Sequence, residues 1–217
     1  MQTHIFNTGR SIFNTFISEI RDTKIQTDPM RFRRNLERMG EIMAYEISKT
    51  LPYAEVEVKT PLGIAKELLP KEKVVVASIL RAGLPLHQGI LNYFDRADNA
   101  FVSAYRKYTE DGDFDIHIEY ISAPSLDGRI VILSDPMLAS GNSMELAYKA
   151  LQQKGKPDHV HLVALIASKV GIEFVENALE GEPVTLWVGA VDDELNAKSY
   201  IVPGLGDAGD LAYGTKL

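Results

Sequence analysis

Residues 129–145 read RIVILSDPMLASGNSME, and this stretch decides the fold. Its apolar run, 129–134, is rich in β-branched residues and predicts a buried strand. Asp135 follows, and after it come a loop of small residues and the start of a helix. In open α/β sheets, ligands bind beyond the carboxyl ends of the strands, where the next helix presents unpaired N–H groups. The stretch therefore predicts a strand, an anion-binding loop and a helix.

The alternation of strands and helices continues on both sides of this stretch. Short apolar runs that alternate with helical patterns are typical of βαβ units, which build a parallel sheet. We expect one domain, 1–217, of the α/β class, with a parallel-stranded sheet that carries helices on both faces. The expected strands are 74–79, 100–104, 129–134, 160–167 and 184–191, and the expected helices are 84–93, 143–154 and 170–179.

Three further segments depart from this alternation. Asp28-Pro29 predicts a helix start, because Asp caps helices and Pro suits the first helical position, and apolar residues recur at helical spacing from Phe32 to Ile47. Segment 105–120 is polar and holds a turn signal, which predicts a hairpin or flap over the active site. The tail, 192–217, has little periodicity, so we expect an ordered loop region there.

Charge and composition exclude several classes of function. A net charge of −7 provides no general basic surface for nucleic acid, so an anionic ligand must bind in a local pocket. No apolar run approaches the ~20 residues of a membrane-spanning helix, and residues 1–10 lack the apolar region of a signal peptide. Without cysteine there is no disulfide or thiolate zinc site, which suits a cytoplasmic protein. We interpret His159 and His161 as exposed strand histidines, so no protein-held transition metal is expected.

The loop after Asp135 has the composition of a phosphate cradle. Residues 139–143 are small enough for backbone amides to wrap a monophosphate, and the serine hydroxyls add donors. Asp135 is placed to accept hydrogen bonds from ribose hydroxyls. The loop is neither a Walker loop nor a dinucleotide-binding GxGxxG. From local pattern alone, an ordinary strand–loop–helix junction stays open as the alternative.

Three motifs then point to one family. DPMLASGNS, 135–143, resembles the phosphoribosyl pyrophosphate loop of the type I phosphoribosyltransferases, and its opening is similar to that of uracil phosphoribosyltransferases. SILRAGLP, 78–85, resembles that family's pyrophosphate loop. YIVPGLGDAGDLAYGT, 200–215, resembles its uracil-binding carboxyl-terminal segment. The three motifs stand in the family's order, and weaker likeness covers nearly the whole chain.

The resemblance implies a role for each matching residue. The implied catalytic residues are Arg81, Arg106 and Asp135. Arg81 and, from the flap, Arg106 would hold the pyrophosphate, and Asp135 would bind the ribose. The remaining implied contacts bind the 5′-phosphate and ribose or form the base pocket through backbone groups. The 5′-phosphate and ribose would be bound by Pro136, Met137, Leu138, Ala139, Ser140, Gly141, Asn142 and Ser143. The base pocket would be formed by Ile201, Gly206, Asp207 and Ala208.

The resemblance also implies partners. The substrates would be uracil and phosphoribosyl pyrophosphate, with Mg²⁺ carried in by the substrate and no metal held by the protein alone. A homodimer or higher homo-oligomer is expected, and activation by GTP is left open. Neither nucleic acid nor a membrane is expected as a partner.

Four positions depart from the family pattern. Ser140 replaces a usual Thr and keeps the hydroxyl, and Asn142 replaces a common Gly, where we expect it to tolerate a positive φ. Lys107 occupies a flap position where an acid is frequent, which puts the charge pattern of the flap in doubt. Leu211 stands where Arg is frequent, and the loss of that cation could alter affinity or regulation.

Two other functions compete with uracil transfer. The same fold could act on another base, or the chain could be a non-catalytic regulator that senses phosphoribosyl pyrophosphate. An unrelated phosphate-binding α/β module is a third alternative, which the pairing of 78–85 with 200–215 disfavours.

Overall fold

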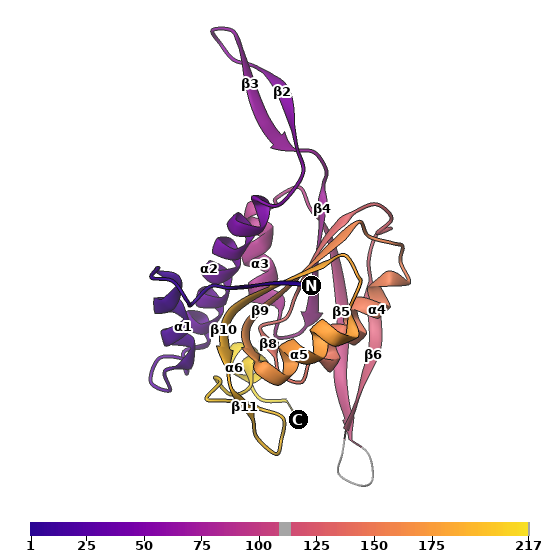
Figure 1. Cartoon of the computed structure of the whole chain (residues 1–217). Helices are drawn as coiled ribbons and strands as arrows, with labels where there is room; N and C mark the ends of the chain where they lie inside the picture. Colours follow the sequence, from indigo (N-terminus) through magenta and orange to yellow (C-terminus); the bar gives the residue numbers. More distant parts are fainter. Residues whose placement is uncertain (109–113, 217) are drawn as a thin grey trace.

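A mostly parallel sheet forms the centre of the molecule, in the strand order β1-β10-β9-β7-β4-β5-β6 (Figure 1). The computed structural model describes residues 1–108 and 114–216, without the side chains of 104–117. Neighbouring strands are parallel except β5 and β6. The predicted strands and the α/β class are confirmed. The strands are β1 (Gln2–Ile5), β4 (Val74–Leu80), β5 (Asp98–Tyr108), β6 (Phe114–Ser122), β7 (Ile130–Ser134), β9 (His159–Ser168) and β10 (Val184–Asp192), and short β8 (Met137–Leu138) pairs with β9.

Helices cover both faces of the sheet, because alternate strand residues point to opposite faces. Val74 and Val76 face one apolar core, whereas Val75 and Ala77 face the other. The first core lies under α1 (Phe13–Arg21), α2 (Pro29–Ser48), α3 (Leu84–Tyr93) and α6 (Ala208–Tyr213), and the second lies under α4 (Asn142–Gln152) and α5 (Lys169–Ala178). Full burial of both faces explains the continuous apolar runs of the central strands.

Helix α2 begins as the sequence predicts. Asp28 is its N-cap, and the Asp28 side chain accepts hydrogen bonds from the N–H groups of Met30 and Arg31. Phe32 and Ile47, at the two ends of the apolar stripe, are buried, at 1% and 0% exposed. The stripe therefore fixes α2 against the sheet.

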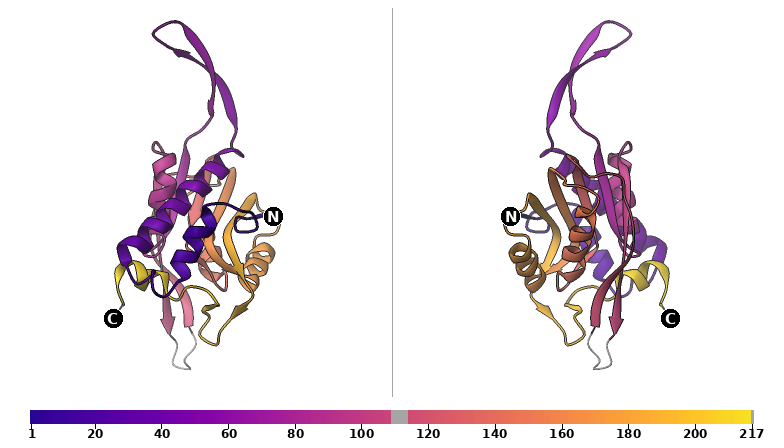
Figure 2. Two further views of the ribbon diagram at one scale, coloured as in Figure 1. Left: turned by 90° about the vertical axis from the view of Figure 1, so that its left-hand side faces the viewer. Right: turned by 90° about the vertical axis from the view of Figure 1, so that its right-hand side faces the viewer.

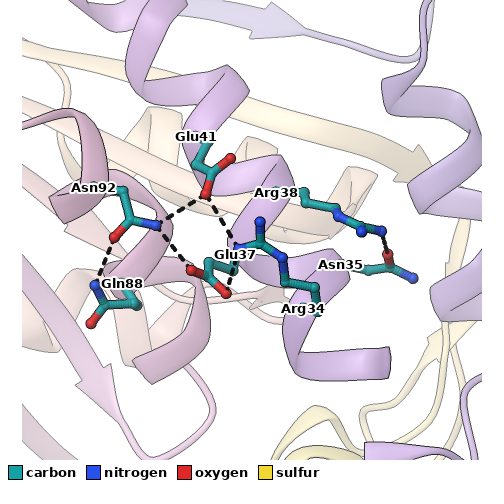
Figure 3. A network of polar contacts seen from close by, with 7 residues as sticks. All are labelled: Arg34, Asn35, Glu37, Arg38, Glu41, Gln88 and Asn92. Atoms are coloured by element: carbon teal, nitrogen blue, oxygen red, sulfur yellow. Dashed lines mark hydrogen bonds and ion pairs between the residues drawn. The ribbon is translucent and has the colours of Figure 1, made fainter. Parts of the chain in front are cut away.

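Helix α3 packs closely on α2, and this contact supports the loop before α3. A Cβ on Gly89 would lie 2.0 Å from the Glu37 carbonyl oxygen, so only glycine permits this approach. A polar network covers the contact (Figure 3). The Asn92 amide donates to Glu37 at 2.9 Å and to Glu41 at 3.0 Å, and Arg34 pairs with Glu37 at 2.8 Å.

Two of the described hairpins are long, and the sequence predicts one of them. β5 and β6 pair antiparallel, which confirms the hairpin within 105–120. Its turn, 109–113, and the side chains of Arg106 and Lys107 lie outside the described residues. The second hairpin, β2 (Tyr53–Lys59) and β3 (Ile64–Pro70), projects from the end of the molecule opposite the carboxyl terminus (Figures 1 and 2).

Three expectations need correction. His161 is buried, at 3% exposed, because β1 continues the sheet beyond β10, and His4 on β1 packs over Trp187 beside it. The tail is more regular than expected, since it forms β11 (Glu194–Leu195), β12 (Ile201–Val202) and α6. Asn142 has no positive φ, because Gly141 takes that conformation and Asn142 starts α4.

Within the described ranges, no helix has both the length and the apolar character to cross a lipid bilayer.

Candidate active site

A cleft of about 840 Å³ opens beyond the carboxyl ends of β4 and β7. Three stretches that are far apart in sequence line it: the loop after β4, the loop after β7 and the carboxyl-terminal segment. These are the three stretches that carry the motifs. Its lining residues are Ile79 to Ala82, Asp135, Met137 to Gly141, Ser143, Met144, Ser199 to Ile201, Gly206 to Asp210 and Lys216.

The loop after β7 is shaped by two glycines. Gly141 has a φ of +87°, and a Cβ there would lie 2.7 Å from the Phe174 ring. Gly171, in the first turn of α5, would place a Cβ 2.3 Å from the Ala139 carbonyl oxygen. The Ser168 hydroxyl donates to that oxygen at 2.6 Å and accepts from the Gly171 N–H at 2.8 Å. The start of α5 therefore holds the loop so that the N-terminus of α4 faces the cleft.

No side chain caps α4, since its N-cap is Gly141 and forms no side-chain cap hydrogen bond. The first N–H groups of a helix lack partners within the helix and carry the positive end of its dipole. An anion in the cleft can therefore bind to the amino end of α4.

Three aspartates, Asp135, Asp207 and Asp210, line the cleft. Burial, with a smaller contribution from the negative charge of Asp207, raises the pKa of Asp135 to about 7 against the opposing hydrogen bond from the Met137 N–H. Asp207 is also the N-cap of α6, and its Oδ1 accepts from the Asp210 N–H at 2.9 Å. The loop after β7 and the carboxyl-terminal segment thus lie close enough for their charges to interact.

Arg81 joins the loop after β4 to the carboxyl-terminal segment. Its Nη2 donates to Asp210 Oδ1 at 2.9 Å and to the Gly214 carbonyl oxygen at 2.6 Å. Its Nε is buried without a hydrogen-bond partner in the part of the chain that the structure describes. A second cation, Lys216, lies 3.5 Å from Asp207. Both cations can therefore bind an anionic ligand if they exchange these internal partners.

Backbone hydrogen bonds and turns shape the carboxyl-terminal wall. The Asn196 side chain accepts from the N–H groups of Lys198 and Tyr200, which closes the turn between β11 and β12. Gly204 and Gly206 then adopt φ values of +56° and +96°. These turns place Ile201 on one side and Gly206 on the other in the lining of the cleft.

Most of the predicted site residues lie together in this cleft. Pro136 and Asn142 do not line it: Pro136 is buried, with its carbonyl oxygen bonded to the N–H groups of Leu165 and Ile166, and Asn142 is exposed. Sequence reasoning assigned no role to Asp210 or Lys216. The sequence signals for them are the second acid of GDAGD, 206–210, and a lysine two residues after 214, and neither signal is specific.

Comparison with known proteins decides the family. A family model described as uracil phosphoribosyltransferase matches residues 8–215. The chain belongs to this family. A uracil phosphoribosyltransferase from Porphyromonas gingivalis is 56% identical over 207 residues, 95% of each protein. Another, from Methanothermobacter thermautotrophicus, is 40% identical over 189 residues and covers 86% of this chain and 85% of that one.

Two solved structures show a similar fold. The AQ2163 protein from Aquifex aeolicus superimposes with a TM-score of 0.87 at 32% identity, and the match covers 99% of this chain and 100% of that one. A hypoxanthine phosphoribosyltransferase from Staphylococcus aureus has a TM-score of 0.50 at 11% identity over 75% of this chain and 76% of its own. That second likeness shows a shared fold alone.

Proposed function

We propose that this chain joins uracil to the ribose of phosphoribosyl pyrophosphate, which forms uridine monophosphate and releases pyrophosphate. A bond forms between a uracil nitrogen and C1 of the ribose, the bond from C1 to the pyrophosphate oxygen breaks, and the nitrogen loses its proton. The observation that carries this proposal is the meeting of the loop after β7 with the glycine-containing segment 201–208 in one cleft.

The loop residues would bind the sugar phosphate. The amino end of α4 and the backbone of 139–141 suit the 5′-phosphate, because N–H groups and the helix dipole favour an anion. Asp135 would accept hydrogen bonds from the ribose hydroxyls. Positive charge that develops on the ribose ring as pyrophosphate departs would be stabilised by the carboxylates of Asp135 and Asp207.

Arg81 and Arg106 would hold the leaving pyrophosphate, with Arg106 acting from the flap. A guanidinium suits this task because it offers several donors in a planar fork. Arg81 would exchange Asp210 and the Gly214 carbonyl oxygen for pyrophosphate oxygens. Ile201, Gly206, Asp207 and Ala208 would form the base pocket, where main-chain donors and acceptors match the carbonyl, N–H and carbonyl edge of uracil.

Mg²⁺ fits this site as an ion that arrives with the substrate. Two acids, Asp135 and Asp207, interact across the cleft, and no group of three or more potential metal ligands occurs among the described residues. Mg²⁺ prefers phosphate oxygens and water with one or two carboxylates. When bound, it would neutralise charge on the pyrophosphate.

The decisive experiment is an assay of the purified protein. Uracil, phosphoribosyl pyrophosphate and Mg²⁺ should yield uridine monophosphate, and uracil should be preferred over hypoxanthine and orotate. Asp135→Asn and Arg81→Ala should each lower kcat/KM by about 10²-fold or more, because each removes charge complementarity to the transition state. Unchanged rates in both variants would refute these roles. Binding of phosphoribosyl pyrophosphate without turnover of any base would instead support a sensor.

Self-association belongs to the same proposal. The β2–β3 hairpin pairs only with itself and exposes Leu62, Ile64 and Leu68, and an isolated hairpin is marginally stable in water. A second copy of the chain that covers this hairpin would form a homo-oligomer. Activation by GTP and a cytoplasmic location stay predictions, which assays with added GTP and cell fractionation would test.

A further inference from the structure

Gly204 is held by an ion pair that lies behind the base pocket. Asp192, the last residue of β10, is 8% exposed, and its two oxygens each accept from Arg21 at 2.8 Å. Asp192 Oδ2 also accepts from the Gly204 N–H at 2.9 Å, and Arg21 Nη1 donates to the Gly204 carbonyl oxygen at 3.0 Å. Both backbone polar groups of Gly204 are therefore bound by this one pair.

The held residue is the corner of the turn that forms the pocket wall. Gly204 has a φ of +56°, and a Cβ there would lie 2.1 Å from the Ile201 carbonyl oxygen. Ile201 before the corner and Gly206 after it both line the cleft. Displacement of Gly204 would therefore move backbone groups on both sides of it.

The strands of this wall are short. β11 and β12 each contain only two residues, and they pair with each other, not with the central sheet. The pair of Arg21 and Asp192 connects the wall to the last turn of α1 and to the end of a central strand. An arginine fork that bonds both carboxylate oxygens has a fixed geometry, which a point charge does not impose.

We propose that Arg21 and Asp192 are positioning residues for the base. Neither residue lines the cleft, so each acts through Gly204 and not by contact with substrate. A pocket that recognises a flat base by main-chain groups depends on the placement of that main chain to within a fraction of an ångström. This role rests on the proposed function and concerns binding of the base, not of phosphoribosyl pyrophosphate.

The chain offers a matched control. Arg31 donates from Nε and Nη2 to the two oxygens of Glu19 at 2.9 and 2.8 Å, and this fork also ties α1 to another element. Within the described part of the chain, neither Arg31 nor Glu19 forms a hydrogen bond with residues 192–216. Arg31→Lys therefore reproduces the loss of an arginine fork at α1 without the loss of the contact to Gly204.

The test compares steady-state kinetics of Arg21→Lys and Arg31→Lys with the unchanged protein. Arg21→Lys should raise KM for uracil about tenfold and leave KM for phosphoribosyl pyrophosphate within about twofold, because the compact lysine ammonium lacks the planar fork that binds both Asp192 oxygens and the Gly204 carbonyl oxygen. Arg31→Lys should leave both values unchanged. Asp192→Asn should act like Arg21→Lys, since its amide nitrogen cannot accept a hydrogen bond.

Three results separate the possibilities. If KM for uracil in both Arg21→Lys and Asp192→Asn equals that of Arg31→Lys, the positioning role is refuted and the proposed function stands. Equal rises in both KM values, together with a fall in Tm, would show a merely structural pair and would also refute the role. If the unchanged protein forms no uridine monophosphate, the proposed function fails and this role fails with it.

Discussion

The ionised Asp135 that the proposed reaction uses destabilises the folded protein. An unpaired carboxyl ionises near pH 3.8, but burial and the charge of Asp207 raise the pKa of Asp135 to about 7. The folded protein therefore holds an extra proton between these values, and above pH 7 the ionised Asp135 destabilises the fold. A bound sugar and cation would relieve this cost, as is common at functional sites.

Replacement of Asp135 should separate the two effects. At pH 8, Asp135→Asn should stabilise the ligand-free protein by about 1–2 kcal/mol, allowing for solvent screening in the cleft, and raise Tm by about 2–6 °C. The gain should be largely lost by pH 3, below the ordinary carboxyl pKa of 3.8, where Asp135 is mostly protonated in both states. Thermal unfolding at the two pH values measures this difference. A lower Tm at pH 8 would contradict the inferred environment of Asp135.

Gly141 should be irreplaceable for two reasons, its positive φ and its contact with Phe174. Gly181 is a matched control, because its φ is +82° but nothing lies within 4 Å of a Cβ there. Gly181→Ala should cost about 1–2 kcal/mol from φ alone. Gly141→Ala should cost more and should also raise KM for phosphoribosyl pyrophosphate at least about tenfold, because the loop must shift. Equal effects of the two substitutions on Tm and KM would contradict this explanation.

At the scale of elements, a group of aromatic rings joins β1, β9 and β10, with His161 and Trp187 buried and His4 and His159 half-buried. The Trp187 Nε1 donates to His161 Nδ1 at 3.1 Å, His4 stacks on Trp187 at 4.2 Å, and His159 lies 4.6 Å from His161. Burial and the neighbouring histidines lower the pKa of His161 to about 3. His161 is therefore neutral in the folded protein at neutral pH, where it accepts the Trp187 N–H.

This group makes the sheet edge sensitive to acid. His161 ionises near pH 6.5 in the unfolded chain and near pH 3 in the folded one. Its contribution to stability is therefore complete above pH 6.5 and falls, by at most about 1.4 kcal/mol per pH unit, as the pH drops toward 3. Denaturant unfolding of the protein and of His161→Gln, which keeps an acceptor for Trp187, measures the difference. Parallel pH dependences of the two proteins would contradict this prediction.

At the scale of the whole molecule, the β2–β3 hairpin and the cleft lie at opposite ends. The hairpin exposes Leu62 fully and Ile64 and Leu68 by about two thirds, at 100%, 67% and 68%. Large apolar side chains grouped on a projecting element are typical of an interaction surface. Because the hairpin belongs to neither apolar core, changes at its tip should leave the fold intact.

Substitution of this surface tests the proposed self-association. Replacement of Leu62, Ile64 and Leu68 together by serine should lower the molar mass in solution and leave Tm of the dissociated chain within about 2 °C, since exposed side chains contribute little to stability. Light scattering during size-exclusion chromatography measures the mass. A triple Lys49, Lys154 and Lys156 to serine variant, on exposed polar surface, serves as the control. An unchanged oligomer in the hairpin variant would place the interface elsewhere.

The sequence by itself determined the central sheet, the main helices and the three motifs of the cleft. These features follow from local rules: apolar runs favour strands, Asp28 and Pro29 start a helix, and small residues form a phosphate loop. The family motifs also indicated which loops belong to one site. A local pattern carries this information because strand, helix-cap and loop preferences depend on residues that are only a few positions apart in the sequence.

Only the tertiary structure decided which distant residues hold the site in shape. Arg21 and Asp192 are 171 residues apart, and Arg81 and Asp210 are 129 apart. No periodicity or helix cap in the sequence indicates such pairs. The sequence also does not distinguish a buried histidine such as His161 from an exposed one, because the burial depends on the position of β1 in the sheet. The hairpin of β2 and β3 was also not predicted; its residues are mostly exposed and belong to neither apolar core. These features depend on how the chain packs, and packing is a property of the whole molecule.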